Sequence, residues 1–247
     1  MSGVARSITG TIAYTSNQAH RAGAERGRES FRMDIHRDGS RVLAAHCEID
    51  DAPAVVRDVN LRLDASNRPR ECFVRIAVGG QFRGSGWFAF NGLQAECEST
   101  TTLEGRVSQR YALDAPLRAF GNHAIINDSY AMSLYDLAQG PGRQSFFMLL
   151  SSPDHRGATG PMLYPVQLSI QYVGEQDIEV IAGRFRARHF RILDVGMPEE
   201  HPEYDLWVTA DEHYVLLRAT VTGYMQTAYE LSSYHVVEHA SSEPAQC

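Results

Sequence analysis

Alternation of apolar and polar residues at every second position is the feature that most constrains how this sequence can fold. In Val55–Asp64, for example, the odd-numbered positions are apolar apart from Arg57, and the even-numbered positions are polar from Asp58 onward. A period of two predicts β-strands with one buried and one exposed face. Because Gly, Pro, Asn and Asp separate these segments without room for a helix, neighbouring strands are expected to pair antiparallel.

Two series of such segments flank one predicted short helix. The first series comprises Arg28–Arg37, Arg41–Asp50, Val55–Asp64, Arg70–Val78, Phe82–Phe90, Leu93–Thr100 and Glu104–Leu113. The second series comprises Arg143–Ser152, Pro165–Val173, Asp177–Ala182, Arg184–Leu193, Tyr204–Thr209, His213–Val221 and Met225–Val237. The helix is predicted over Asp128–Leu137, with Asp128 or Ser129 as its cap and Gly140 and Pro141 at its end.

This many antiparallel strands would leave exposed edges unless the sheet curls. We therefore predict an all-β fold: a large antiparallel, lipocalin-like barrel or half-barrel, or two fused small barrels, with one short helix. One domain is expected over residues 1–239, with two loose halves that meet near residues 128–142, and residues 240–247 are expected to form a disordered tail. A barrel of this kind can hold a ligand inside.

The charge balance and the apolar content argue against two classes of partner. The net charge is −7 at pH 7, and no arginine-rich stripe alternates with aromatic residues, so nucleic-acid binding is not expected. No apolar run approaches the roughly 18 residues that a membrane span needs. The first residues lack the apolar stretch of a secretory signal. We therefore expect a cytoplasmic protein that binds neither nucleic acid nor a membrane.

Residue types that are missing or scattered limit the chemistry further. All 23 residues counted as Lys or Arg are arginine, which excludes lysine Schiff bases and lysine-bound pyridoxal phosphate. None of the four cysteines belongs to a CxxC pair, and no spacing of metal ligands recurs. The sequence therefore predicts a protein without metal or organic cofactor, in which Cys47, Cys72 and Cys97 are buried free thiols.

Two polar segments beside the predicted helix depart from the strand pattern. They are Phe120–Asp128 and Ser151–Pro161, and each places a histidine near an aspartate. Such a pair can orient an imidazole that carries a proton near neutral pH. The alternative is a structural role, in which Asp128 caps the helix and Asp154 forms a turn. The candidate catalytic residues in and beside these segments are His123, Asp128, Tyr135, His155 and Arg156.

Arginines on apolar faces and aromatic side chains are candidates for binding a flat carboxylic acid. A guanidinium donates two parallel hydrogen bonds to a carboxylate, although an internal salt bridge or an exposed head group would also account for such an arginine. A tyrosine hydroxyl can also give or take a proton. We expect Trp207 and Tyr229 to pack in the core. The candidate substrate-binding residues are Arg57, Arg75, Trp87, Tyr164, Arg218 and Tyr224.

Four stretches of the sequence carry a resemblance to known proteins. Phe82–Phe88, Gly105–Gln109, Gly121–Asp128 and His155–Pro161 resemble a bacterial group of lipocalin-like β-barrel proteins that occur in degraders of aromatic compounds. Within that group, the chain is similar to the decarboxylases that open phenylcoumaran lignin dimers into stilbenes. At the level of fold, it also resembles the phenolic acid decarboxylases, small cofactor-free barrels that use Tyr, Arg and a carboxylate.

The resemblance implies a cofactor-independent lyase, a decarboxylase that acts on a small aromatic, lignin-derived carboxylic acid inside the barrel. Loss of carbon dioxide leaves an electron pair, which a phenol or quinone methide conjugated to the reacting carbon can accept. An arginine would hold the carboxylate, and a histidine or tyrosine would manage the phenol proton. Two alternatives stay open: a lipocalin-like binding protein for a hydrophobic ligand, and a cofactor-free isomerase or hydratase. A homodimer is compatible with all three.

Overall fold

The strands form one continuous sheet that folds back over itself. The computed structural model describes residues 3–154, 157–195, 202–223 and 225–240. Within these residues the sheet has fifteen strands, in the order β8-β7-β6-β5-β4-β3-β2-β1-β15-β14-β13-β12-β11-β10-β9. Because β1 pairs with both β2 and β15, it joins two series of strands in the middle of the sheet.

The two series and the short helical elements have the following bounds. The first series is β1 (Val4–Ser16), β2 (Glu25–His36), β3 (Arg41–Ile49), β4 (Val55–Leu63), β5 (Pro69–Val78), β6 (Gln81–Asn91), β7 (Gln94–Thr101) and β8 (Gly105–Ala112). The second is β9 (Phe120–Gly121), β10 (Gly142–Leu150), β11 (Tyr164–Val180), β12 (Gly183–Asp194), β13 (Tyr204–Thr209), β14 (Leu216–Val221) and β15 (Thr227–Glu238). The helical elements are η1 (Ala19–Arg21), α1 (Ile125–Ala131), η2 (Met132–Leu134) and η3 (Leu137–Gln139).

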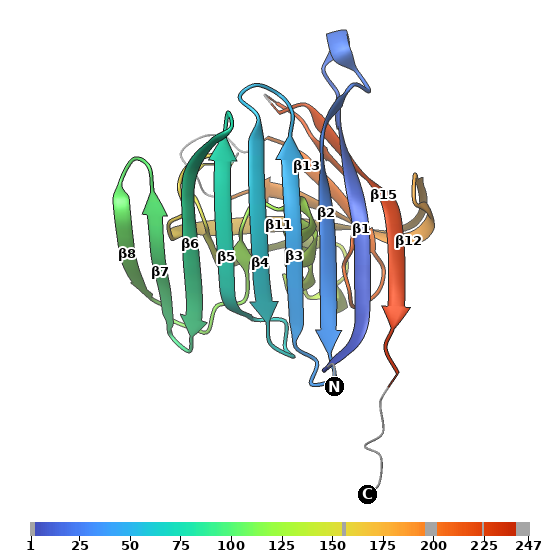
Figure 1. Ribbon diagram of the computed structural model, residues 1–247. Helices are drawn as coiled ribbons and strands as arrows, with labels where there is room; N and C mark the ends of the chain where they lie inside the picture. Colours follow the sequence, from blue (N-terminus) through green and yellow to red (C-terminus); the bar gives the residue numbers. More distant parts are fainter. Residues whose placement is uncertain (1–2, 155–156, 196–201, 224, 241–247) are drawn as a thin grey trace, which may run out of the picture.

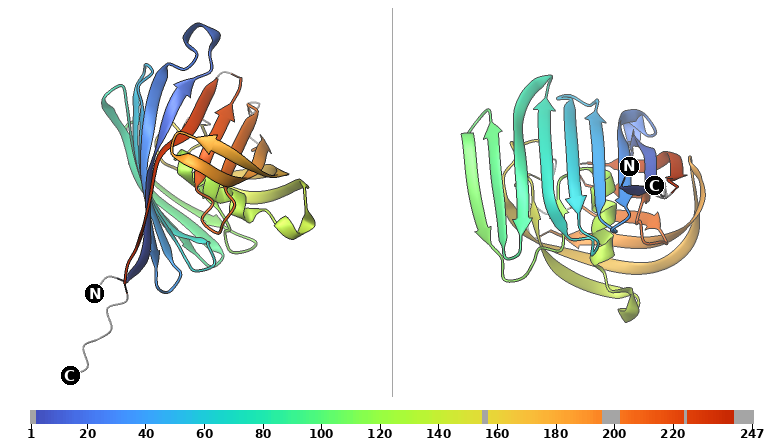
Figure 2. Two further views of the ribbon diagram at one scale, coloured as in Figure 1. Left: turned by 90° about the vertical axis from the view of Figure 1, so that its right-hand side faces the viewer. Right: turned by 60° about the horizontal axis from the view of Figure 1, so that its bottom comes forward.

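The two series form two layers around α1. In Figure 1, β1–β8 and β15 make one broad layer, and β11, β12 and β13 cross behind it. The turned views of Figure 2 show the second layer leaning over the first, with α1 between them. The described strands pair antiparallel apart from β9 and β10, and the edges β8 and β9 stay separate. The predicted all-β fold, one large antiparallel sheet with a short helix, is therefore confirmed in its half-barrel form.

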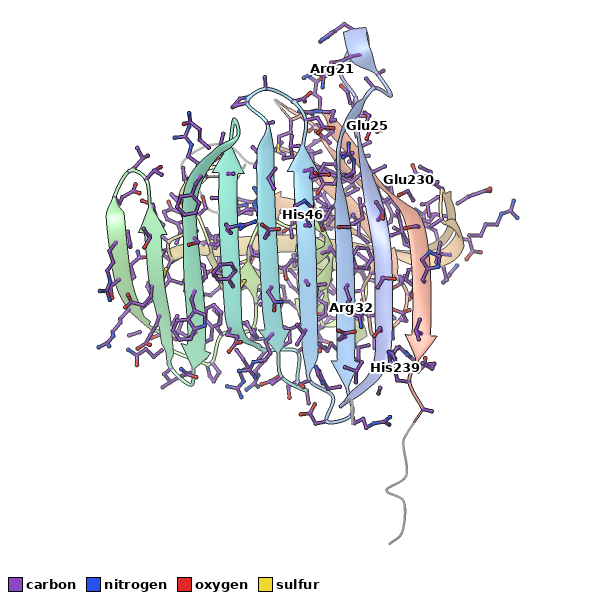
Figure 3. All side chains as sticks on the ribbon, in the orientation of Figure 1. Arg21, Glu25, Arg32, His46, Glu230 and His239 are labelled. Carbon is purple, nitrogen blue, oxygen red and sulfur yellow. The ribbon has the colours of Figure 1, made fainter. Side chains whose placement is uncertain are left out.

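Alternation turns one face of each strand into a shared core. In β4, every second residue from Val55 to Leu63 is buried. Phe88 of β6 and Phe190 of β12 come from opposite layers, and both are fully buried. The other face of the first layer is mostly polar, and Figure 3 shows Arg32 of β2 and His46 of β3 on it. Burial of the apolar face, at roughly 25 cal/mol per Å², therefore favours folding the second layer over the first.

Three elements differ from the prediction, each for a local reason. No strand is predicted at β1, because the Ser, Thr and Gly residues of this segment weaken the contrast between its two faces. Gly174 has a φ of 149° at a register shift, so the chain continues as the single strand β11 where a turn is predicted. β14 begins at Leu216 rather than His213, because Thr209 N donates to Val215 O and holds the preceding residues in a loop.

The connection after β10 covers the inner face of β6, β7 and β8. Ser99 Oγ of β7 donates a hydrogen bond to Pro161 O at 2.7 Å, and Leu163 N donates to Gln109 Oε1 of β8 at 2.7 Å. Gly84 and Gly86 of β6 leave the space that Pro161 fills. This contact gives the two glycines of the Phe82–Phe88 stretch a packing role.

Gly86→Ala is expected to lower the free energy of unfolding by about 1–3 kcal/mol, because it overpacks this contact. The added methyl group would lie 2.8 Å from Pro161 Cβ and 2.9 Å from Ser99 Cβ. Urea denaturation measures the change. Ser85→Ala, at the next position on the opposite face, is the control and should change stability by less than about 0.5 kcal/mol. Equal losses in the two variants would contradict this account of the contact.

Candidate functional site

A cavity of about 660 Å³ lies between the two layers and α1. This volume falls within the range of roughly 300–1,000 Å³ that is typical of small-molecule sites. Strands of both series line it, together with α1 and the connections β1–β2, β3–β4 and β14–β15. Most lining side chains are apolar. The polar groups away from these connections are Tyr14, Arg26, Arg57, His123, Asp128, Tyr204 and Tyr229.

Arg57 is a buried arginine that reaches the cavity from the inner face of β4. Its exposed fraction is 3%. One guanidinium nitrogen donates to His123 O at 2.7 Å, and another donates to Gly157 O at 3.1 Å. The first carbonyl belongs to the segment before α1 and the second to the connection after β10. Arg57 therefore holds together the two polar segments that the sequence singles out.

His123 lies directly against the second of these segments. A Cβ at Gly157 would come within 2.5 Å of His123 Cγ, so only a glycine lets the imidazole approach this closely. His123 itself has a φ of 62°, in the left-handed region that non-glycine residues rarely adopt. Strained backbone of this kind often marks a functional position. His123 lines the cavity together with Arg57.

Glu29 is a fully buried carboxylate that holds the start of α1. Its two oxygens accept hydrogen bonds from Ile125 N at 2.9 Å and Ile126 N at 3.0 Å. The predicted cap at Asp128 or Ser129 is therefore wrong: the helix begins at Ile125, and its capping acceptor comes from β2. A side chain remote in sequence satisfies the first amides, so no cap residue is needed within the helix itself.

Asp128 points from α1 into the cavity and is half-buried. The Tyr204 hydroxyl of β13 donates to Asp128 Oδ2 at 3.1 Å. Burial raises the pKa of Asp128 to about 7; the charge of Glu29 raises it further, while the Tyr204 hydrogen bond and Arg57 oppose the rise. A carboxyl with this pKa exists in both protonation states near neutral pH, so Asp128 can donate or accept a proton.

Three tyrosines complete the polar part of the wall. The rings of Tyr14 and Tyr229 meet edge to face, with centroids 4.7 Å apart, and the Tyr14 hydroxyl donates to Glu29 Oε2 at 2.8 Å. Burial raises the pKa of Tyr229 to about 12, with a further contribution from the charge of Asp128. Burial also raises the pKa values of Tyr14 and Tyr204 well above their ordinary value. All three hydroxyls therefore stay protonated at neutral pH and can donate hydrogen bonds.

Two arginines and one aspartate form the rim of the cavity: Arg21 on the β1–β2 connection, Arg26 near the start of β2 and Asp51 on the β3–β4 connection. Arg21, which Figure 3 labels on the β1–β2 connection, bonds to Asp51. Arg26 donates to Asp51 Oδ2 at 2.5 Å and to Met225 O at 2.5 Å. Burial raises the pKa of Asp51, but the hydrogen bonds from Arg21 and Arg26 outweigh this effect and lower the pKa. The rim therefore carries one net positive charge, which attracts anionic ligands to a protein of net charge −7.

Of the eleven residues that the sequence analysis proposes for the site, the structure brings three together at the cavity: Arg57, His123 and Asp128. Their assigned roles stay predictions. His155, Arg156 and Tyr224 lie outside the described residues.

Arg75, Trp87 and Arg218 lie on the outer face of the sheet rather than at the cavity. Trp87 is 44% exposed because its neighbours along β6, not Trp87 itself, point inward. Arg75 pairs with Asp58 at 2.7 Å, because the opposite face of β5 is the buried one. Arg218 donates to Glu179 O at 2.7 Å; a register shift near the start of β14 buries two successive leucines and turns Arg218 outward.

Tyr135 and Tyr164 pack against the core away from the described cavity lining. The Tyr135 hydroxyl donates to Gly140 O at 2.9 Å, and its ring contacts Tyr172 and Phe190. Tyr164, at the start of β11, is half-buried and packs against the main hydrophobic cluster. Both therefore have structural surroundings, and neither contacts the carboxyl group of Asp128.

Several residues of the site are missed by the sequence analysis. Tyr14 and Tyr204 are not proposed, although both line the cavity, and Tyr229 packs in the core as expected but also lines the cavity. Glu29 is also missed, although the sequence pattern could have identified it: Glu29 shares the inner face of β2 with Phe31 and Met33. An acid on an apolar strand face must find donors, so it marks a polar site.

Other features bear on cofactors and location. Among the described residues, no three His, Cys, Asp or Glu side chains gather as a metal site requires. Cys47, Cys72 and Cys97 are buried free thiols, and burial raises the pKa of Cys97 to about 11. None of the helices in the described segments has the length and apolar content to cross a membrane.

Comparisons with known proteins support the fold. No family model matches the sequence, and no curated protein matches it. Among solved structures, the chain is similar to a β-barrel-like protein of the domain of unknown function DUF1849 from Brucella abortus, with a TM-score of 0.60 and 10% identity over 95% of this chain and 98% of that chain. This likeness shows the β-barrel-like fold alone.

Two further solved structures match more weakly. One is a DUF1089 family protein from Pseudomonas aeruginosa, with a TM-score of 0.40 and 12% identity over 80% of this chain and 90% of that chain. The other is a protein with a YmcC-like fold from Bacteroides fragilis, with a TM-score of 0.33 and 9% identity over 94% of this chain and 96% of that chain. Both scores are too low to carry an argument about this chain.

Proposed function

We propose that the protein is a cofactor-independent lyase that decarboxylates a small aromatic, lignin-derived carboxylic acid in the cavity. One observation carries the proposal: a buried arginine and a carboxyl with a pKa of about 7 line the same cavity, among protonated tyrosines. An anion-binding group and a proton donor at neutral pH are the two functions that this reaction requires.

In this proposal, Arg57 binds the carboxylate of the substrate. The two backbone carbonyls that it contacts fix the direction of the guanidinium but leave it positively charged. A guanidinium in an apolar, partly enclosed cavity attracts a carboxylate more strongly than one in water does. The positive rim formed by Arg21, Arg26 and Asp51 attracts the negatively charged carboxylate toward the cavity entrance.

Asp128 supplies the proton that balances the reaction. The bond from the carboxylate carbon to the rest of the substrate breaks, carbon dioxide leaves, and the bonding electron pair moves into the conjugated phenol or quinone methide. The product anion then takes a proton from the Asp128 carboxyl, which regains one from solvent. One proton is consumed for each carbon dioxide released. The apolar wall keeps the carboxylate poorly solvated, which favours its loss of charge.

A binding protein for a hydrophobic ligand is the second candidate, because most of the cavity wall is apolar. Such a carrier would use Arg57 to hold the head group of the ligand and would leave Asp128 without a proton-transfer role. The three buried free thiols suit a reducing compartment, so we place either activity in the cytoplasm.

Incubation with a panel of lignin-derived phenolic acids, including phenylcoumaran acids, tests the proposal. We expect release of carbon dioxide together with the absorbance of a stilbene or another extended conjugated product. Binding of the same acids is measured in parallel by calorimetry. Tight binding without turnover would favour the carrier, and the absence of both turnover and binding would reject the proposal for these acids.

A further inference from the structure

The buried carboxylate of Glu29 lies behind the cavity lining, where it contacts the lining residues Tyr14 and Ile125, and its surroundings tie it to Asp128. On the inner face of the sheet, Glu29 of β2 lies opposite Cys47 of β3, which lies opposite Arg57 of β4. The Cys47 thiol donates to Glu29 Oε2 at 3.0 Å. These side chains form a polar row across three strands whose inner face is otherwise apolar apart from Arg41 at the start of β3.

Four donors converge on this one carboxylate. Besides Cys47, they are the Tyr14 hydroxyl and the backbone amides of Ile125 and Ile126. A fully buried carboxylate is costly unless such donors satisfy it. Two of the four belong to the first turn of α1, so Glu29 fixes this helix to the first layer of the sheet.

The helix that Glu29 fixes is the one that carries Asp128. α1 has seven residues, and its first backbone amides need acceptors from outside the helix. Asp128 follows Ile125 and Ile126 by only two or three residues, within the same turn of helix. A shift of the first turn therefore moves the Asp128 carboxyl by a similar amount and strains its hydrogen bond with Tyr204.

We propose that Glu29 is a positioning residue: through α1 it holds the Asp128 carboxyl at the cavity wall beside the Tyr204 hydroxyl. The negative charge of Glu29 raises the pKa of Asp128 and so keeps its carboxyl protonated, while the hydrogen bonds of Glu29 hold that carboxyl in place. The catalytic part of this role rests on the proposed lyase function, whereas the positioning can be measured without any substrate.

The groups that face Asp128 and Glu29 come from every element packed around them, and their charges must be considered together. Arg57 opposes the rise in the pKa of Asp128, and the Tyr204 hydroxyl opposes it as well. Burial raises the pKa values of Tyr14, Cys47, Tyr204 and Tyr229, so these four groups are neutral at pH 7. The facing set is Tyr14, Cys47, Arg57, His123, Tyr204 and Tyr229.

Glu29→Gln tests the proposal by removing the charge at nearly constant size. In protein carrying 13C-labelled aspartate carboxyl groups, NMR follows the titration of Asp128 directly. We expect the pKa of Asp128 to fall by ~0.5 unit or more, because a nearby negative charge is lost and α1 loosens. Glu48→Gln is the matched control: Glu48 follows Cys47 on β3, is partly exposed and pairs with Arg28 on the outer face, so the Asp128 titration should not move.

Two outcomes would overturn the proposal. The first is a folded Glu29→Gln variant in which Asp128 titrates as in the wild type, or in which Glu48→Gln shifts the titration equally. The second needs no variant, so it holds even where Glu29→Gln fails to fold. Hydrogen exchange in the wild-type protein should show the Ile125 and Ile126 amides protected like those of β2, and exchange as fast as in exposed loops would contradict the contact with Glu29.

Turnover measurements separate this proposal from the proposed function. With an accepted substrate, Glu29→Gln should reduce kcat by about 10- to 100-fold through misplacement of Asp128 and leave KM nearly unchanged, since Arg57 is retained. If the wild type turns over none of the acids, the lyase proposal fails, while the NMR titration and the hydrogen exchange still decide the role of Glu29. A purely structural role would lower stability without moving the Asp128 titration in the folded molecule.

Discussion

Asp128→Asn is expected to reduce turnover by about 100- to 10,000-fold while the protein stays folded, because it removes the proposed proton donor. Asparagine has nearly the same size, and its amide oxygen can still accept the Tyr204 hydrogen bond. Substrate affinity should change little, since Arg57 is untouched. The loss should therefore fall on kcat rather than on KM.

The same substitution should change two pH profiles. Turnover by the wild type should decline as pH rises through about 7, because only the protonated carboxyl donates, and this decline should vanish in the residual activity of Asp128→Asn. Stability follows the same group: its pKa is raised from about 4 in the unfolded chain to about 7 in the folded protein. The unfolded state therefore binds fewer protons between these values, and the wild type loses stability relative to Asp128→Asn as pH rises from about 4 to about 7.

Initial rates and urea denaturation at several pH values measure both effects. Asp114→Asn, at an exposed position, is the control and should leave both profiles unchanged. Wild-type turnover in Asp128→Asn would rule out the proton-donor role. A parallel pH dependence of stability in the wild type and in Asp128→Asn would show that the pKa of Asp128 is not raised by burial.

Arg57→Met should have the second large effect, on both binding and stability. The variant loses the donors to His123 O and Gly157 O, so two carbonyls that join the polar segments lose their partner. Leaving such buried groups unsatisfied costs roughly 1–3 kcal/mol for each group, so we expect a loss of about 2–4 kcal/mol in the free energy of unfolding. Binding of aromatic carboxylates should weaken by at least about 100-fold, because their charge partner is gone.

Arg75→Met, one strand away and on the outer face, is the matched control for Arg57→Met. Its ion pair with Asp58 is largely solvent-exposed, so its removal should change stability by about 0.5 kcal/mol or less and leave ligand binding intact. Urea denaturation and calorimetric titration measure the two quantities. Similar ligand affinity in Arg57→Met and Arg75→Met would show that the carboxylate binds elsewhere.

Most strands can be predicted from the sequence because their alternation is local. β4 is the clearest case: apolar residues at every second position of Val55–Leu63 determine both the strand and its buried face, Arg57 included. The two polar segments around α1 also stand out locally, since their His, Asp and Gly residues break the strand pattern. Local pattern therefore predicts the sheet and points to one side of the cavity.

Where either face of a strand could be the buried one, the local pattern does not show which face it is. In β5, the face that carries Phe73 and Arg75 could be the buried one by sequence, but Val74 and Ile76 on the other face are buried instead. Register shifts have a similar effect, because the one near the start of β14 reverses the face of Arg218. These outcomes depend on how whole strands pack against each other, which a local pattern does not contain.

Contacts between residues far apart in sequence account for the rest of what is missed. Glu29 meets the amides of Ile125 and Ile126 across a separation of 96 and 97 residues, so nothing near α1 in the sequence reveals its cap. Tyr14 and Tyr229 form one wall of the cavity from opposite ends of the chain. Their partnership exists only once β1 and β15 have paired.

The pairing of β1 with β15 also affects how the protein is made. Arg6 and Glu238 are partners in the finished sheet although they lie 232 residues apart, and β15 is made after the other fourteen described strands. Until β15 has been made, the thirteen-residue strand β1 presents a long unpaired edge next to a growing, still open sheet. The nascent chain is therefore exposed to edge-to-edge aggregation throughout translation of its second half, so chaperones that shield strand edges would matter most for its yield in cells.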